Sequence, residues 1–208
     1  TMGLIKQTPA EGVRGDTRTS ARDCPSLCKQ LLAADPEARR WAARDLVDCP
    51  DCSEALVEAL QVEPDASVRE VMLTSITRIG DGTAVNGLVA CLRSEDAGLR
   101  NEAIEAMKQL PDAVAPIMLG LLMDEDSDVR IFAVNILESL RHPLVENWLL
   151  QVIDVDDHVN VCGTAVDLLG EVGGAASLES LLRLKVRFAD EPYIQYAADL
   201  AIKRIQEN

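Results

Sequence analysis

The stretch Asp126-Ser-Asp-Val-Arg130 decides the fold of this chain, together with the residues that follow it, Ile131-Phe-Ala-Val-Asn-Ile-Leu-Glu-Ser-Leu140. Related stretches recur along the sequence: Asp35-Pro-Glu-Ala-Arg39, Asp65-Ala-Ser-Val-Arg69, Asp96-Ala-Gly-Leu-Arg100, Asp156-Asp-His-Val-Asn160 and a diverged Glu191-Pro-Tyr-Ile-Gln195. Successive aligned aspartates are 30, 31, 30 and 30 residues apart. A fixed period of this length is typical of a repeat architecture, in which each unit packs on its neighbours. We therefore expect a line of similar units with one continuous core.

The composition suits closely packed helices and argues against two classes of partner. Hydrophobic residues make up 48% of the 208, whereas aromatic residues make up 3%. Acidic residues outnumber basic ones by 35 to 20, which gives a net charge of −15. Nucleic-acid binding needs a basic surface, so we expect no nucleic-acid partner. No run of about 18 apolar residues is present, so we expect no membrane span. Because the N-terminus has no apolar signal core, we expect a cytoplasmic protein with reduced thiols.

Each repeat is expected to contain two helices. The first helices are predicted at 25–33, 52–61, 83–93, 113–123, 143–153 and 176–187. The second helices are predicted at 36–47, 66–79, 97–110, 127–140, 157–170 and 191–206. Apolar residues such as Val68, Met72, Ile76 and Ile79 recur at helical spacing. Residues 1–22 contain few large apolar groups and are expected to form a flexible tail, which leaves residues 23–208 for the repeat domain.

The second repeat carries a family resemblance. The segment Ser67-Val-Arg-Glu-Val-Met-Leu-Thr-Ser-Ile-Thr-Arg-Ile-Gly-Asp-Gly-Thr-Ala-Val-Asn-Gly-Leu-Val-Ala-Cys-Leu92 resembles the HEAT-like repeat first described in phycobilin lyases. The resemblance extends over residues 24–206 and implies an all-α fold, a right-handed α-solenoid of about six HEAT-like helical hairpins. It does not fix a function, because the same repeat serves lyases, scaffolds and adaptors. Asn160 replaces the arginine in repeat five, and repeat six loses both residues, as expected of an atypical C-terminal cap.

The repeated Asp and Arg residues permit two interpretations. In one, each Asp caps its helix and each Arg bonds a neighbouring repeat, which makes a structural ladder. In the other, they line a charged functional groove. We favour the ladder, because nearly every repeat carries the pair at one fixed position. Asp51-Cys-Ser-Glu54 has the spacing of a further helix start, a capping box.

No catalytic set is evident in the sequence. Gly80-Asp-Gly82 lacks the Gly-Lys-Ser/Thr of a phosphate loop and is expected to be a turn between helices. His142 and His158 are not part of paired His-Glu motifs, so the resemblance to HEAT-repeat di-iron hydroxylases fails. No Ser-His-Asp or Cys-His set can be assembled from the sequence order. We therefore expect a protein that is not an enzyme.

The residue after the ladder arginine suggests a partner-binding strip. In the last three repeats this position holds Ile131, Val161 and Tyr196. If these side chains are exposed on the concave side of the solenoid, they form an apolar strip that binds another protein. The alternative is that they pack under the C-terminal end of the array.

Four of the six cysteines have the spacing of a metal site, whereas Cys91 and Cys162 are expected to be core residues. The pattern C-x3-C-x20-C-x2-C places the four at Cys24, Cys28, Cys49 and Cys52. Stacked first helices would bring both pairs to neighbouring helix N-termini, where a lowered thiol pKa favours a metal. We expect zinc or an iron–sulfur cluster. The competing interpretations are a redox disulfide within the C-x-x-C pair and four unconnected thiols.

Taken together, these features predict a non-catalytic HEAT-repeat scaffold or adaptor that binds another protein, with a four-cysteine metal centre in its first repeat. Two alternatives stay open. One is a redox- or metal-sensing signalling adaptor with an iron–sulfur cluster. The other is a lyase-type maturation factor for tetrapyrrole attachment, which the family resemblance implies.

Overall fold

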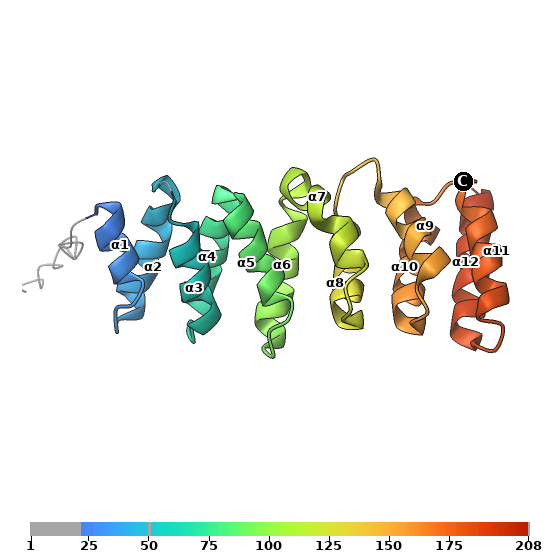
Figure 1. Cartoon of the computed structure of the whole chain (residues 1–208), viewed down its shortest axis with the longest axis horizontal. Helices are drawn as coiled ribbons and strands as arrows, with labels where there is room; N and C mark the ends of the chain where they lie inside the picture. Colours follow the sequence, from blue (N-terminus) through green and yellow to red (C-terminus); the bar gives the residue numbers. More distant parts are fainter. Residues whose placement is uncertain (1–21, 50, 208) are drawn as a thin grey trace, which may run out of the picture.

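The computed structural model describes residues 22–49 and 51–207, so the predicted tail lies outside the described residues except for Arg22. Twelve α-helices and one short 3-10 helix make up the described part of the chain, which contains no strand. The helices follow one another along a single row, with α1 at one end and α11 and α12 at the other (Figure 1). The prediction of an all-α solenoid is confirmed.

Each of the six repeats is a pair of helices. The first helices are α1 (Cys24–Gln30), α3 (Ser53–Val62), α5 (Gly82–Cys91), α7 (Pro111–Leu122), α9 (Val145–Val155) and α11 (Ser177–Arg187). The second helices are α2 (Pro36–Asp45), α4 (Ala66–Ile79), α6 (Ala97–Lys108), α8 (Ser127–Leu137), α10 (Val159–Val172) and α12 (Pro192–Glu207), and the 3-10 helix η1 (Leu46–Asp48) follows α2. All twelve lie within a few residues of the predicted ranges.

Aspartate side chains start most of the second helices. Asp35, Asp65, Asp96 and Asp126 each occupy an N-cap, where the carboxylate accepts hydrogen bonds from backbone amides of the first turn. Such a cap stabilises a helix by about 1 kcal/mol, because it satisfies amides that have no partner inside the helix.

The predicted capping box at Asp51–Glu54 is wrong. Asp51 has a positive φ of 59°, and the N-cap of α3 is Cys52, whose side chain makes no capping bond. The Ser53 hydroxyl instead donates to Asp81, the N-cap of α5 in the next repeat. This hydroxyl therefore connects two repeats.

The core runs the length of the row, because second helices stack on second helices and first helices on first helices. In α4 the side chains of Val68, Met72 and Ile76 are completely buried, and Ile79 is half-buried behind them. This stripe is the helical face predicted from the spacing, and equivalent stripes of neighbouring helices pack against it.

The arginine ladder is confirmed. Arg39 forms an ion pair with Glu63 at 2.6 Å, Arg69 with Asp96 at 2.9 Å and Arg130 with Asp156 at 2.7 Å. In each case the carboxylate belongs to the next repeat. Arg100 is the exception: it donates to the backbone carbonyl of Ser94 and lies over the ring of Phe132. Most of these arginines thus hold adjacent repeats together.

Candidate functional site

The predicted apolar strip is not formed. Ile131 on α8 is half-buried, Val161 on α10 has no exposed area, and Tyr196 on α12 is 70% exposed. Val161 belongs to the core and cannot contact a partner. Of the three, Tyr196 alone is well placed to do so.

The physical reason is a change in repeat length. Corresponding buried pairs are Ala103-Ile104 in α6 and Ala133-Val134 in α8, 30 positions apart, but the next pair, Ala165-Val166 in α10, lies 32 positions further on. The N-caps agree, since Asp126 of α8 corresponds to His158 of α10. Asp156 therefore corresponds to Asp124, not to Asp126. The predicted strip thus paired Val161 with Ile131, although Val161 corresponds to the buried Val129. Matching Phe132-Ala-Val134 with Thr164-Ala-Val166 in the sequence would have revealed the shift.

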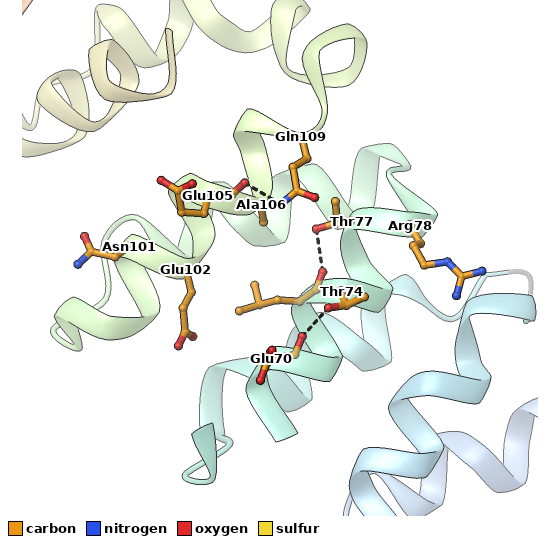
Figure 2. Close-up of a pocket in the computed structure, with 10 residues that line it drawn as sticks. Glu70, Thr74, Thr77, Arg78, Asn101, Glu102, Glu105, Ala106 and Gln109 are labelled. Carbon is orange, nitrogen blue, oxygen red and sulfur yellow. Dashed lines mark hydrogen bonds between the residues drawn. The ribbon is translucent and has the colours of Figure 1, made fainter. Parts of the chain in front are cut away.

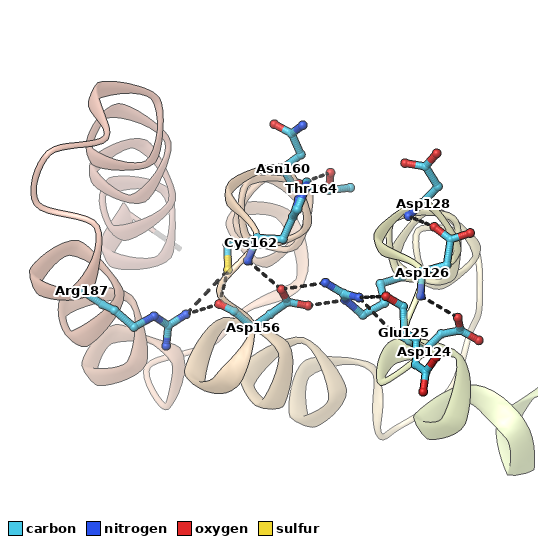
Figure 3. Close-up of polar contacts among 11 residues, drawn as sticks. Asp124, Glu125, Asp126, Asp128, Asp156, Asn160, Cys162, Thr164 and Arg187 are labelled. Carbon is cyan, nitrogen blue, oxygen red and sulfur yellow. Dashed lines mark hydrogen bonds and ion pairs between the residues drawn. The ribbon is translucent and has the colours of Figure 1, made fainter.

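Cys162, not Asn160, occupies the arginine position of repeat five. Its thiol donates to the backbone carbonyl of Asp156 at 3.0 Å, as Arg130 donates to that of Asp124 at 2.8 Å. Arg187 of the last repeat donates to the same Asp156 carbonyl at 2.6 Å and lies 3.7 Å from the Cys162 sulfur (Figure 3). Arg187 of the last repeat thus makes the contact with the Asp156 carbonyl that a ladder arginine at position 162 would make.

A groove of about 390 Å³ lies between α4 and α6. Figure 2 shows its lining residues, which come from α4, from α6 and from the C-cap of α6: Glu70, Leu73, Thr74, Thr77, Arg78, Asn101, Glu102, Glu105, Ala106 and Gln109. Thr74 and Thr77 turn their hydroxyls back to carbonyls of their own helix, at Glu70 and Leu73. Carboxylates are therefore the main polar groups that the groove offers to a partner.

The face formed by the second helices is acidic. The groove between α4 and α6, which we call the α4–α6 groove, carries three glutamates against one arginine, Arg78. A second, smaller groove between α8 and α10 is lined by Glu138, Asp167 and Glu171 with no basic residue. Lys108 lies between the two and donates to Glu105 at 2.9 Å and to Glu138 at 3.5 Å. The second-helix face therefore has an excess of negative charge.

The structure brings the four predicted metal-ligating cysteines together in the first repeat. We call Cys24, Cys28, Cys49 and Cys52 the thiol cluster. Cys24 and Cys49 form a disulfide, with Cα atoms 5.6 Å apart. The sulfur of Cys52 lies within 4.8 Å of both bonded sulfurs and 3.7 Å from that of Cys28. The disulfide is not within the C-x-x-C pair, because Cys49 faces α1.

Burial governs the thiol chemistry of the cluster. It raises the pKa of Cys52 to about 11, with a further contribution from the hydrogen bond with Cys28. The expected lowering of the pKa is therefore wrong for Cys52, because burial outweighs the proximity of the helix N-terminus. Without a metal, Cys52 is a neutral thiol at pH 7.

The remaining singled-out residues have structural roles. Cys91 and Cys162 are buried core residues, as predicted, and burial raises the pKa of each to about 11. His142 stacks on Trp148 and accepts a hydrogen bond from the Leu144 amide. Within residues 22–49 and 51–207, no helix combines the length and the apolar content needed to cross a membrane.

Comparison with known proteins adds the family. The HEAT repeats model matches residues 24–108, 53–130 and 114–203. Bilin biosynthesis protein PecE of Mastigocladus laminosus is 27% identical over 174 residues, which cover 78% of this chain and 64% of that relative. The chain thus spans less than two thirds of this curated relative.

Two solved structures match the chain at low similarity. The complex of CpcE and CpcF of phycocyanin lyase from Nostoc sp. PCC7120 is 18% identical, with a TM-score of 0.39 over 99% of each chain. Human deoxyhypusine hydroxylase is 17% identical, with a TM-score of 0.45 over 90% of this chain and 76% of its own.

Proposed function

The chain belongs to the HEAT-repeat family, and from this premise we propose that it is a non-catalytic scaffold or adaptor that binds another protein through its second helices. The observation that carries the proposal is the pair of acidic grooves on that face. Solenoids present extended surfaces that suit elongated segments of a partner. Because opposite charges steer and orient association, the partner segment is basic.

The α4–α6 groove supplies both charge and apolar contact. Leu73 and Ala106 line it, while Glu70 and Glu105 are exposed beside them. A lysine or arginine side chain can lay its methylene groups on such apolar atoms and place its charge near a carboxylate. Tyr196, 70% exposed on α12, is a proposed anchor at the far end of the same series of helices.

The test measures binding of fluorescently labelled lysine- and arginine-rich peptides by anisotropy. The double variant Glu70→Lys/Glu105→Lys reverses two charges in the α4–α6 groove and is expected to weaken binding at least about tenfold, which corresponds to about 1.4 kcal/mol. The matched control is Glu54→Lys/Glu58→Lys, which makes the same charge change at exposed positions of the first helix α3.

The control separates a site from general attraction. Loss of binding in both double variants to the same degree would show only attraction to net charge, and unchanged binding in the groove variant would refute the proposal. A shortened chain lacking residues 1–20 checks whether the chain's own Lys6, Arg14 and Arg18 compete for the groove.

A lyase-type role in tetrapyrrole attachment is the second candidate, and the similarity to PecE favours it. Its test is direct: purified protein is mixed with a linear tetrapyrrole and its visible absorption is recorded. A shifted band that survives gel filtration supports a maturation factor, whereas unchanged pigment absorption supports the scaffold.

A metal centre at the thiol cluster, as in a metal- or redox-sensing adaptor, is also part of the proposal. We place the protein in the cytoplasm, where thiols stay reduced and the four sulfurs are free to bind a metal.

A further inference from the structure

We propose that the thiol cluster is a zinc site that oxidation disassembles. In the reduced protein all four sulfurs bind one zinc ion, and the Cys24–Cys49 disulfide of the present structure forms when the ion leaves. This inference rests on the metal centre of the proposed function and specifies its metal and its regulation, but it does not depend on partner binding, because the cluster lies at the opposite end of the chain from Tyr196.

The sulfur positions fit a single ion. Zinc–sulfur bonds of about 2.3 Å in a tetrahedron place the sulfurs about 3.8 Å apart. The sulfurs of Cys28 and Cys52 already lie 3.7 Å apart, and Cys52 lies within 4.8 Å of Cys24 and Cys49. The sulfur of Cys28 lies outside the group of three that are within 4.8 Å of one another, so once the disulfide opens the Cys28 side chain turns toward Cys24 and Cys49 to complete the tetrahedron. An iron–sulfur cluster places several iron and sulfide atoms between its thiolates, so it needs wider separations, and zinc is the better fit.

The backbone accommodates both states. Cys24 and Cys28 lie one turn apart on α1, and Cys49 and Cys52 flank the turn before α3. Asp51 in that turn has a left-handed backbone conformation, which bends the chain so that Cys49 and Cys52 both face α1. A separation of 5.6 Å between the Cα atoms of Cys24 and Cys49 lies in the range of disulfides, and side-chain rotation opens it to the spacing of zinc ligands.

The oxidant that converts the two thiolates into a disulfide is a small-molecule disulfide of the glutathione class, which accepts the two electrons. The thiolates of Cys24 and Cys49 lose two electrons and form a sulfur–sulfur bond, while the bond of the oxidant breaks to give two thiols. Zinc keeps its charge and leaves as the aqueous ion. Solvent supplies four protons: two go to the two sulfurs of the reduced oxidant, and one each goes to Cys28 and Cys52.

The experiment begins with protein reduced by a phosphine under argon and supplied with Zn²⁺. Elemental analysis after desalting is expected to give about one zinc per chain, as a closed site requires. Oxidised glutathione is then added in steps, and a chromogenic chelator measures the released zinc. Mass spectrometry of peptides follows the Cys24–Cys49 linkage, which is expected to appear in proportion to the zinc released.

A matched pair of variants tests the ligand set. Cys28→Ala removes a half-buried sulfur of the cluster, and Cys91→Ala removes a buried sulfur outside it. Cys28→Ala is expected to weaken zinc binding at least about tenfold, because even residues that only support a ligand cost 10–100-fold. It keeps the Cys24–Cys49 disulfide on oxidation, which shows that the repeat is folded. Cys91→Ala is expected to bind zinc as the unmodified chain does.

Three results would overturn the proposal. One is less than about a tenth of an equivalent of zinc in reduced, unmodified protein, far below the loading of a closed site. Another is equal zinc affinity in Cys28→Ala and the unmodified chain. The last is zinc that stays bound after the disulfide has formed completely. The first of these needs no variant, so poor folding of a variant cannot obscure the outcome.

Discussion

Arg130 shows how one side chain can join two repeats. Its guanidinium binds the carboxylate of Asp156 through two nitrogens and also donates to the backbone carbonyls of Asp124 and Glu125. The Asp156 side chain is only 7% exposed, and besides Arg130 it accepts a hydrogen bond from the backbone amide of His158. A buried ion pair adds little over an apolar pair, but loss of one partner leaves the other charge uncompensated.

Replacing Arg130 with alanine is therefore expected to destabilise the protein by about 2–4 kcal/mol. Arg93→Ala is the control, because Arg93 also pairs with a carboxylate, that of Asp124, but is 49% exposed. An exposed pair contributes about 0–1 kcal/mol, so this variant should unfold almost as the unmodified chain does. Chemical denaturation followed by circular dichroism gives both values. Equal losses in the two variants would contradict the role assigned to burial.

At the same scale, Cys52 is expected to react slowly with alkylating reagents. Its pKa is raised to about 11 from 9.0 by burial and by Cys28, so at pH 8 its thiolate fraction is about a hundredfold lower than that of an ordinary thiol. The measurement is iodoacetamide labelling of reduced, metal-free protein, read by peptide mass spectrometry, with glutathione as the reference. Labelling of Cys52 should rise steeply between pH 9 and about 11. A rate equal to that of glutathione at pH 8 would contradict the assignment.

At the scale of elements, glycines set how closely helices approach. Gly163 of α10 lies under the ring of Tyr193 at the start of α12, and Gly170 of the same helix lies against Ala201. A Cβ atom at Gly163 would overlap the tyrosine ring, whereas one at Gly170 would be 3.3 Å from the Cα of Ala201. The last repeat therefore packs directly on the helix whose register changed.

Gly163→Ala is expected to destabilise the protein by about 1 kcal/mol, because the added Cβ displaces the half-exposed Tyr193 ring, which then loses its hydrogen bond to Asp167. Gly120→Ala is the matched control, because Gly120 lies in α7 with no atom within 4 Å of an added Cβ. There alanine should stabilise by up to about 1 kcal/mol through helix propensity.

Thermal unfolding of both variants distinguishes the two effects. The additional change Tyr193→Ala should restore part of the loss in the Gly163 variant. If the loss of stability in the double variant equalled or exceeded the sum of the losses in the two single variants, steric overlap would not be the cause.

At the scale of the whole molecule, charge decides which partners approach. The net charge of −15 is concentrated in part on the second-helix face, where both grooves are acidic. The ladder offsets only part of this charge: Arg69 lies 3.6 Å from Glu102 of the α4–α6 groove, whereas Glu70 and Glu105 are exposed. The long-range field therefore repels polyanions and attracts cationic segments.

The whole chain is accordingly expected to show no appreciable affinity for nucleic acids. Polarisation of labelled single- and double-stranded DNA and RNA at low salt is the most permissive measurement, because phosphate contacts are strongest there. The basic peptides used for the α4–α6 groove serve as the positive control. Salt-sensitive nucleic-acid binding at micromolar protein would reveal a basic surface and contradict the expectation.

The sequence by itself determined the all-α repeat fold, the helix positions, the aspartate caps and the grouping of four cysteines. These features depend on local chemistry and on a period, both of which are written along the chain. Asp126 caps its own helix, and the fixed spacing brings Cys24 and Cys28 back beside Cys49 and Cys52.

Only the tertiary structure decided register and pairing. Two added residues in repeat five placed Val161 in the core and Cys162 at the arginine position, because the buried face of α10 must align with its neighbours whatever the loop length. The contact with Arg187 spans 25 residues and follows from that packing. The sulfur pairing and the raised pKa of Cys52 depend in the same way on which groups are packed together and removed from water, and no local pattern specifies this.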